Sequence, residues 1–240
     1  MRSVLFALAI LVASVPVAHA AHPLITEDTG TQGSRHWQLE VFGEEGRERA
    51  SGARLEQYYA VFSYGIAEHA DLQLGLPRLR QAASGWGDAA LDLKWRFFEK
   101  DALSMGVQPG VTLPTGDEQR GLGAGHLGWG TLFILSYEPG PLALHSHLGY
   151  KRNRNSLGER ESLTHFSVAL AYKVAGSLKL VADLARNSNP DPAASGAERY
   201  LVLGAIWSMT KDFDLDVGVK TGHGSAALDE AFSLGGTWRW

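Results

Sequence analysis

Alternation of apolar and polar residues with a period of two repeats along almost the whole chain. About a dozen segments carry it, and no stretch of useful length shows the 3.6-residue periodicity of a helix. Successive side chains of a strand point to opposite faces, so each segment is expected to be a strand with one apolar and one polar face. The expected strands are residues 36–44, 55–65, 70–77, 87–98, 103–113, 125–138, 142–151, 162–174, 178–187, 198–209, 213–221 and 230–240.

The connectors between these strands alternate between short and long. The long ones are rich in Gly, Ser, Asn or charge, as loops are. The short connectors are residues 66–69, 99–102, 138–141, 175–177 and 210–212, and the long ones are 44–54, 78–86, 114–124, 152–161, 188–197 and 222–229. A barrel in the outer membrane has short periplasmic turns and longer external loops. The pattern therefore predicts an all-β fold, a transmembrane antiparallel up-and-down β-barrel of about 12 strands with both termini in the periplasm.

Charge indicates which face of the strands meets lipid. In the segments 87–98, 178–187 and 213–221 one parity reads as apolar, and the opposite parity carries the charges Asp88, Asp92, Lys94, Arg96, Lys179, Asp183, Asp214, Asp216 and Lys220. A soluble ligand-binding barrel would turn the apolar face inward. A charge against lipid near the midplane costs about 2–4 kcal/mol, so we expect the apolar face outward and the charged face in the lumen. The predicted lumen-lining residues are Asp92, Lys94, Arg96, His126, His145, His147, His165, Lys179, Asp183, Asp214, Asp216, Lys220 and Arg239.

Aromatic residues give a second indication of a lipid-facing barrel, because interfacial girdles of Trp, Tyr and Phe flank the apolar belt of such proteins. Following the chain up and down places one group near the periplasmic ends of the strands: Trp37, Tyr64, Phe97, Tyr137, Tyr172, Trp207, Phe213 and Trp240. Trp129, Tyr150, Phe166 and Tyr200 fall nearer the outer ends. Strand propensity alone would account for their presence but not for this clustering.

The two ends of the chain divide it into three parts. Residues 1–20 read as a cleaved secretory signal peptide, with Arg2 before an apolar run and a small-x-small site before Ala21. Residues 21–35 are a polar periplasmic segment, either a terminal tail or a plug in the barrel mouth. Residues 36–240 are the expected barrel. Its last strand alternates up to Trp240 and looks like the terminal strand by which outer-membrane barrels are recognised by their assembly machinery.

Composition and motifs argue against several other functions. Without Arg2, 21 basic and 26 acidic residues remain, which is no nucleic-acid footprint, and the chain has no cysteine. His145 and His147 share a face without a clear third metal ligand. His165 and Ser167 have the spacing of a lipid-hydrolase pair, but their parity turns them into the lumen. We therefore expect no enzyme activity, no metal and no cofactor.

Four stretches together resemble a known family. His22–Gly33, Gly85–Asp88 with Leu91–Phe97, Leu113–Asp117 and Asp212–Gly218 are similar to the outer-membrane family labelled "meta-pathway of phenol degradation". The resemblance covers nearly all of the chain after residue 20. It implies an outer-membrane barrel described as a transporter, and it brings no catalytic or binding residues with it.

These observations predict a protein of the Gram-negative outer membrane, exported by its signal peptide and surrounded by outer-membrane lipids. The favoured function is a passive channel or transporter for small molecules, with aromatic compounds among the candidates because of the resemblance. A closed structural or surface-interaction barrel is the alternative, and a lipid-modifying enzyme is a third. Eight strands are just filled by side chains and sixteen leave a channel, so strand number leaves the open or closed state of the lumen undecided.

Overall fold

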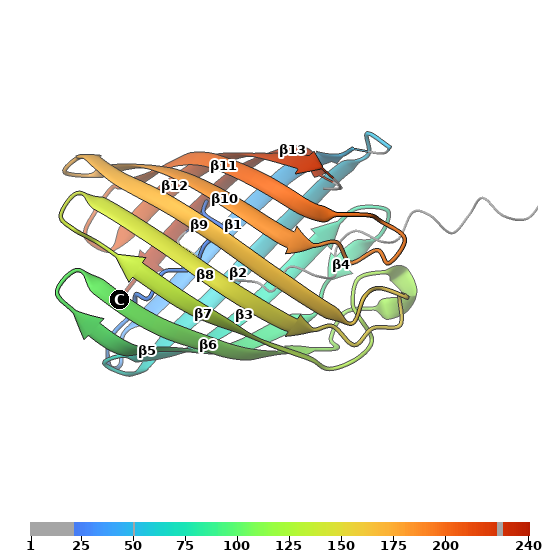
Figure 1. The fold of residues 1–240 in the computed structure, drawn as a ribbon, viewed down its shortest axis with the longest axis horizontal. Coiled ribbons are helices and arrows are strands. Elements are labelled where there is room, and N and C mark those ends of the chain that lie inside the picture. Colours follow the sequence, from blue (N-terminus) through green and yellow to red (C-terminus); the bar gives the residue numbers. More distant parts are fainter. Residues whose placement is uncertain (1–21, 50, 225–227) are drawn as a thin grey trace, which may run out of the picture.

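The computed structural model describes residues 22–49, 51–224 and 228–240, so the expected signal peptide lies outside the described residues. The described chain forms one antiparallel sheet that closes into a barrel (Figure 1). Its strands are β1 Trp37–Glu48, β2 Arg54–Ala67, β3 Ala70–Arg80, β4 Ser84–Trp86, β5 Ala89–Lys100, β6 Leu103–Leu113, β7 Gly128–Tyr137, β8 Leu142–Arg152, β9 Ser162–Ala175, β10 Leu178–Ser188, β11 Ala197–Ser208, β12 Phe213–Gly224 and β13 Leu228–Arg239. Within these residues no helix is long and apolar enough to cross a membrane.

All twelve expected strands are confirmed, and the differences lie at their ends. The hairpin β1–β2 continues its pairing into residues that were expected to be loop. β12 extends to Gly224 by pairing with β11, and β13 begins at Leu228, which pairs with Glu48 of β1. The short strand β4 lies in the expected connector 78–86, where Trp86 pairs with Arg78 of β3 and its ring lies 5.5 Å below the Arg78 guanidinium. Residues 114–127 form a connector that contains the single turn of 3-10 helix Glu118–Arg120, so β7 begins later than expected.

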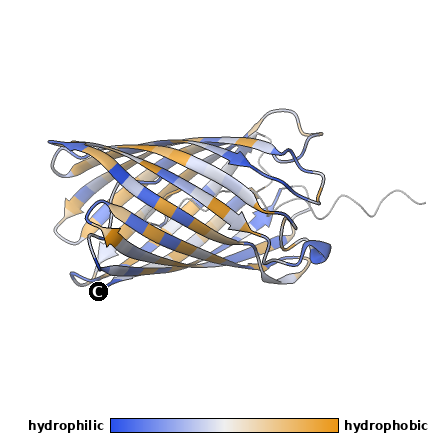
Figure 2. Ribbon diagram, turned by 90° about the horizontal axis from the view of Figure 1, so that it is seen from below, coloured by the Kyte–Doolittle hydropathy of each residue, from blue (hydrophilic) through white to orange (hydrophobic). Residues whose placement is uncertain are grey.

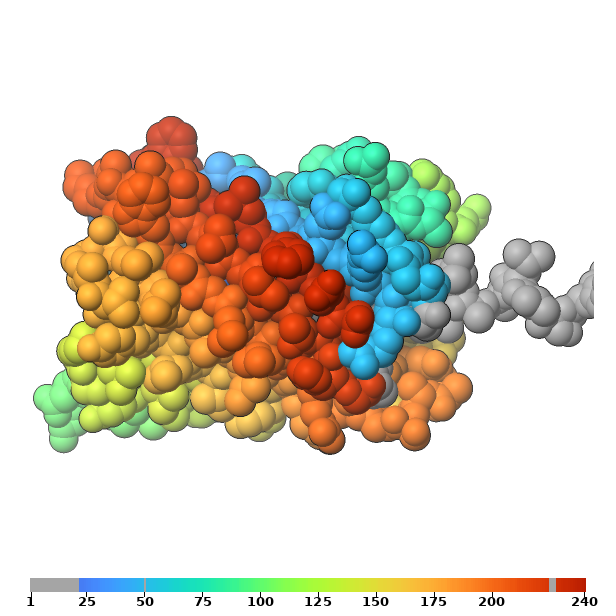
Figure 3. All heavy atoms as spheres, turned by 90° about the horizontal axis from the view of Figure 1, so that it is seen from above, coloured from blue at the N-terminus to red at the C-terminus, as the bar shows by residue number. Residues whose placement is uncertain are grey.

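The barrel closes where the first long strand meets the last. β1 pairs along its length with β13, from Gln38 opposite Arg239 to Glu48 opposite Leu228. Trp37 N donates to Trp240 O at 2.9 Å, and Trp240 N donates back to Trp37 O at 3.1 Å. Figure 3 shows this seam as the red C-terminal strand against the blue N-terminal strand. Because β1 pairs with both β2 and β13, the sheet has no free edge there, which is how barrels satisfy their backbone in lipid.

The predicted direction of the two strand faces is confirmed. Large apolar side chains on the outward parity are exposed, among them Leu184, Leu203 and Phe232, and Figure 2 shows the resulting alternation along the strands. The inward parity carries buried polar residues such as Lys94 and Asp183. The lumen is therefore a polar interior inside an apolar belt, as in membrane barrels.

Two residues depart from the expected patterns. Tyr200 faces inward on β11, where it packs against buried Leu55, Leu228 and Ala231, so its assignment to the outer girdle was wrong. Arg186 is exposed on the outward parity of β10, the face that was expected to be apolar. It lies near the end of the strand, where a charge on the lipid face costs only about 0–1 kcal/mol.

The two ends of the barrel differ. The short connectors, including residues 101–102 and 176–177, gather at one end with the C-terminus, and the long connectors gather with β4 at the other (Figure 1). We call these the short-connector end and the long-connector end. The exposed aromatic residues Trp37, Tyr137, Tyr172 and Trp207 lie at the short-connector ends of their strands, as expected of one girdle.

Candidate functional site

The lumen holds part of the chain itself. Residues 22–34, here named the lumen segment, precede β1 and lie inside the barrel (dark blue in Figure 1). Their contacts run round the wall from β12 through the middle strands to β3. Thr26, Glu27 and Thr29 are almost completely buried. An irregular backbone is tolerated at membrane depth only where it is enclosed by protein or lines an aqueous cavity, and the barrel supplies that enclosure.

Hydrogen bonds to inward side chains hold the middle of the lumen segment. The backbone amides of Ile25 and Thr26 both donate to Asp183 Oδ2 on β10, at 2.7 and 2.6 Å. Thr26 Oγ1 donates to Ser167 Oγ on β9 at 2.8 Å. Bonds to a charged acceptor contribute more than neutral ones, so Asp183 is a principal anchor of this segment.

A second set of bonds fixes the next turn of the lumen segment against β6 and β7. Thr29 N donates to Ser136 Oγ at 3.1 Å, and the hydroxyl groups of Thr29 and Ser104 lie 2.5 Å apart. Small hydroxyl side chains on the wall therefore supply partners for backbone groups that have no strand neighbour. This satisfies the requirement that buried backbone polar groups be paired.

A buried ion pair joins the lumen segment to β5. Lys94 Nζ lies 2.6 Å from Glu27 Oε2, and both side chains are nearly inaccessible to solvent. Asp28 Oδ1 lies farther from the same ammonium, at 3.8 Å. Glu27 N also donates to His147 Nδ1 at 2.9 Å, which identifies Nδ1 as the unprotonated nitrogen of that ring.

Apolar and aromatic contacts hold the start of the lumen segment. The ring of His22 stacks on Phe42 at 4.3 Å, Phe42 stacks on Tyr59 at 4.9 Å, and His22 hydrogen-bonds Asp216. Leu24 packs on a buried cluster of Ala171, Val181 and Ile206. The lumen is therefore not uniformly polar, since one side carries a short aromatic stack.

The wall itself is shaped to receive Pro23. Gly204 on β11 and Gly218 on β12 are direct cross-strand partners. A Cβ atom at either position would lie 2.5 or 2.6 Å from the Pro23 ring, which is closer than carbon atoms can approach. Both positions therefore need glycine while the lumen segment occupies this place.

The structure brings most of the predicted lumen residues together on the inner wall. Seven of them are buried there: Lys94, His145, His147, His165, Asp183, Asp214 and Asp216. Partly buried on the same inward parities are Asp92, Arg96, Lys179, Lys220 and Arg239. Lys220 pairs with Glu44, and Arg239 Nη1 lies 2.9 Å from Asp214 Oδ2. The exception is His126, which was expected on a strand but is exposed in the connector before β7.

The histidine and serine residues of the wall are engaged in structural contacts. The rings of His147 and His165 lie 4.4 Å apart. His165 hydrogen-bonds Asn187, Ser167 accepts from Thr26, and His145 Nδ1 lies 2.8 Å from Ser136 Oγ. In the described part of the chain, no three His, Asp or Glu residues are placed to hold a metal ion.

Sequence reasoning missed the uncharged polar side chains of the wall. Gln108 Nε2 donates to Gln73 Oε1 at 3.1 Å, and Gln73 Nε2 donates to Ser63 Oγ at 3.3 Å. A chain of two amides and a hydroxyl therefore runs from β6 past β5 to β3 and β2. All three residues are buried, as is Glu40 on β1. The same parity argument that selected the charges would have found them, because each lies at an even spacing from an inward neighbour.

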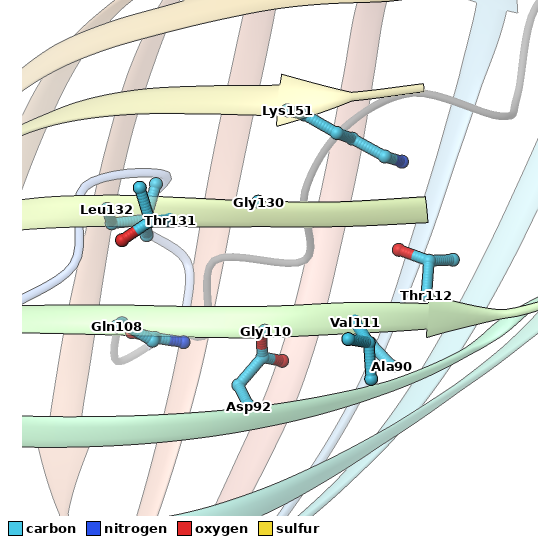
Figure 4. Close-up of a pocket in the computed structure, with 10 residues that line it drawn as sticks. All are labelled: Ala90, Asp92, Gln108, Gly110, Val111, Thr112, Gly130, Thr131, Leu132 and Lys151. Carbon is cyan, nitrogen blue, oxygen red and sulfur yellow. The ribbon is translucent and has the colours of Figure 1, made fainter. Parts of the chain in front are cut away.

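A cavity lies on the inner wall between β5 and β8 (Figure 4). Its polar lining includes Asp92, Gln108, Thr112 and Lys151, and its volume is about 30 Å³, enough for one or a few water molecules. Asp92 lies across Gly110, where a Cβ atom would be 1.7 Å from the carboxylate. This wall therefore carries a small polar space that Asp92, Gln108, Thr112 and Lys151 border.

The long connectors on this side of the barrel are joined to one another. Ser156 N donates to Ala124 O at 2.9 Å, and Arg160 N donates to Pro190 O at 2.8 Å. The Arg160 guanidinium donates to three carbonyl groups of connector 189–196. Glu159 lies beside Arg160 in the connector between β8 and β9. Burial raises the pKa of Glu159, and a hydrogen bond from the amide of Asn153 opposes this shift. These bonds give the long-connector end a fixed rim over β7 to β11.

Solved structures with this fold are outer-membrane channels and porins. An outer membrane channel from Pseudomonas putida F1 superimposes with a TM-score of 0.68 at 14% identity, over 89% of this chain and 98% of that one. The NanC porin gives 0.63 at 11% identity, over 83% and 98%. The KdgM porin gives 0.62 at 6% identity, over 84% and 98%. At these identities the likeness shows the shared fold.

No curated protein matches the sequence. A family model described as "Putative MetA-pathway of phenol degradation" matches residues 42–240, which include nearly all of the barrel. With its apolar belt and polar lumen, the protein is a β-barrel of the Gram-negative outer membrane, and the chain belongs to this family.

Proposed function

We propose that this barrel is a passive channel for small molecules whose lumen segment acts as a plug. The observation that carries the proposal is the way in which that segment is held. Its bonds to the wall are made by side chains such as Asp183, Lys94 and Ser136 rather than by strand pairing. Such contacts can be released without breaking the barrel sheet, so the segment can move while the wall persists.

The orientation is part of the proposal. Outer-membrane barrels have short periplasmic turns and long external loops, so the long-connector end should face the outside and the termini the periplasm. Glu68, Asp71 and Gly65 hold the last residues of the lumen segment near the short-connector end. The plug would then be connected to the barrel at its periplasmic end.

Small, partly aromatic molecules are the proposed cargo. The stack of His22, Phe42 and Tyr59 offers ring faces inside the lumen, and planar aromatic molecules can stack on such faces. The family description, which refers to phenol degradation, supports the same class. Removal of the lumen segment would expose Phe42 and Tyr59 to the passage.

Planar-bilayer conductance of the purified protein tests the channel and its plug together. A variant that lacks residues 22–34 should conduct with a severalfold larger, ohmic unit conductance than the intact protein. An intact heat-modifiable barrel with no conductance in either form would instead favour a closed structural barrel, and equal conductance in both forms would contradict the plug.

A reversible lock gives a sharper form of this test. The chain has no cysteine, and the hydroxyl groups of Thr26 and Ser167 lie 2.8 Å apart, so cysteines at these two positions would bring their sulfur atoms close together. The variant Thr26→Cys/Ser167→Cys should lose conductance on oxidation and regain it on reduction. The single variants serve as controls, and conductance that is insensitive to oxidation despite complete disulfide formation would show that molecules pass beside the lumen segment.

A lipid-modifying enzyme receives less support from the geometry. His165 and Ser167 face the lumen, and each is hydrogen-bonded to another residue, Asn187 and Thr26 respectively. The folds that match are channels and porins. An unchanged lipid profile in cells that carry His165→Ala would argue against this activity, whereas a changed profile would require it to be reconsidered.

A further inference from the structure

Two arginine residues lie side by side on the outer wall of the barrel, near the long-connector end. Arg186 on β10 and Arg199 on β11 are direct cross-strand partners. Both lie on the outward parity and both are exposed. The outward residue opposite Arg199 on the next strand is His223 of β12. Three basic or titratable side chains therefore form one row across β10, β11 and β12.

Within the part of the chain that the structure describes, no acidic side chain is paired with Arg186 or Arg199. Among the described residues, neither guanidinium takes part in an ion pair or a side-chain hydrogen bond with another residue, in contrast to other outward arginine residues at the same end. Arg54 lies 2.9 Å and Arg80 3.5 Å from Glu56, and Arg152 pairs with Glu161. Like charges directly opposite each other destabilise a sheet. An anion between them would remove that repulsion.

The surroundings of the pair indicate what kind of anion it meets. Phe166 is the cross-strand partner of Arg186 on its other side, and Leu184 is the next outward residue of β10 towards the middle of the barrel. These side chains are 48% and 63% exposed, as part of the apolar belt. The arginine pair therefore lies at the edge of this apolar surface.

We propose that Arg186 and Arg199 bind a phosphate group of an outer-leaflet glycolipid, with its acyl chains along Phe166 and Leu184. Guanidinium groups bind phosphate in a planar, bidentate manner, and two parallel forks can hold one phosphate from both sides. The proposal commits to a lipid headgroup rather than a free anion because the apolar surface continues directly below the pair. It rests on the proposed orientation, in which the long-connector end faces the outside.

Binding of lipid A to the full, detergent-solubilised barrel tests this site. The probes are diphosphorylated lipid A, the same lipid after enzymatic dephosphorylation, and inorganic phosphate, each measured by native mass spectrometry. The variant Arg186→Gln/Arg199→Gln should bind diphosphorylated lipid A at least tenfold more weakly than the unmodified protein. Dephosphorylated lipid A should bind both proteins equally weakly.

The variant Arg54→Gln/Arg80→Gln is the matched control, because these arginine residues face the same way at the same end but are paired with Glu56. Its affinity for diphosphorylated lipid A should stay within about twofold of that of the unmodified protein. Equal losses in both double variants, or no loss in the first, would overturn the site. If millimolar inorganic phosphate displaced bound lipid A from the protein as effectively as free lipid A does, the assignment of the site to a lipid would be overturned.

The orientation is measured separately, so its failure can be told apart from failure of the site. Ser195 is exposed in the connector between β10 and β11, and a Ser195→Cys variant can be labelled in intact cells by an impermeant maleimide. Labelling supports the external position of the pair. A cysteine that reacts only after the outer membrane is opened would overturn the glycolipid proposal, even if the arginine pair binds phosphate in detergent.

Discussion

The ammonium group of Lys94 on β5 lies 2.6 Å from a carboxylate oxygen of Glu27, inside the barrel and away from solvent. This pair is one of the charged links between the lumen segment and the wall. Two buried charges compensate each other, but the removal of one partner leaves the other charge buried and unpaired, at a cost of about 3–5 kcal/mol. The pair therefore contributes strongly to holding the segment in place, together with the bonds to Asp183.

Replacement of Lys94 by Met should loosen the lumen segment. The variant leaves the Glu27 carboxylate without its cation, so docking should weaken by about 3–5 kcal/mol, and the barrel should conduct more often in planar bilayers. The double variant Lys94→Met/Glu27→Gln removes both charges and should return most of the way to the behaviour of the unmodified protein. A double variant that conducts as often as Lys94→Met would show that the charge itself is not what matters.

Gly65 should be intolerant of a side chain. A Cβ atom at this position would lie 1.7 Å from Gly33 O, a backbone atom that cannot turn away. Arg35 N also donates to Gly65 O at 2.7 Å, so the residues before β1 are tied to the end of β2. We expect Gly65→Ala to destabilise this junction by about 1–3 kcal/mol. The temperature at which heating shifts the gel migration of the barrel from the folded to the unfolded position should fall.

Gly176 provides the control for Gly65. It lies in the short connector between β9 and β10, and a Cβ atom there would meet nothing within 4 Å. Gly176→Ala should therefore leave the migration temperature unchanged. If both variants shifted it equally, the effect would belong to loss of glycine at the short-connector end rather than to the contact with Gly33.

The wall of this barrel could be predicted from the sequence, because its signals are local and repeated. Most strands show period-two alternation, and the charges of β5 and β12 select the inward face by themselves. Tyr200 was misplaced because an aromatic residue near a strand end is consistent with either face. His126 was misplaced because β7 begins two residues after it, and strand ends are set by pairing with β6 and β8 rather than by composition.

The path of the lumen segment could not be read in the same way. Residues 22–34 have no periodicity, and their partners are remote in the sequence, such as Asp183 for Thr26 and His147 for Glu27. Only a closed barrel brings these wall residues round one segment. The sequence left a tail and a plug as alternatives, and a choice between them requires the position of the wall.

A lysine in the middle of the outward face of β11 should destabilise the barrel. Leu203 is 54% exposed and lies near the centre of the strand. Leu203→Lys would place a charge against the lipid midplane, at a cost of about 2–4 kcal/mol. Ala197 has the same parity at the end of the strand, so Ala197→Lys should cost only about 0–1 kcal/mol. Urea titration in lipid vesicles measures both, and equal costs would contradict a lipid-facing wall.

The seam between β1 and β13 should be sensitive to loss of Trp240. Two backbone hydrogen bonds join Trp240 to Trp37, and the indole of Trp240 lies 6.5 Å from that of Trp238 at the outer surface. Deletion of Trp240 removes both bonds and one aromatic side chain, whereas Trp240→Phe keeps the bonds and an aromatic ring.

We therefore expect the deletion to reduce the amount of folded, heat-modifiable barrel in the outer membrane severalfold, and Trp240→Phe to reduce it little. The same expectation follows if the assembly machinery recognises this strand by its final aromatic residue. Spontaneous folding of the purified chain into lipid vesicles separates the two causes. A deletion that folds normally in vesicles but poorly in cells would point to recognition, because loss of the two seam bonds alone would slow folding in both settings.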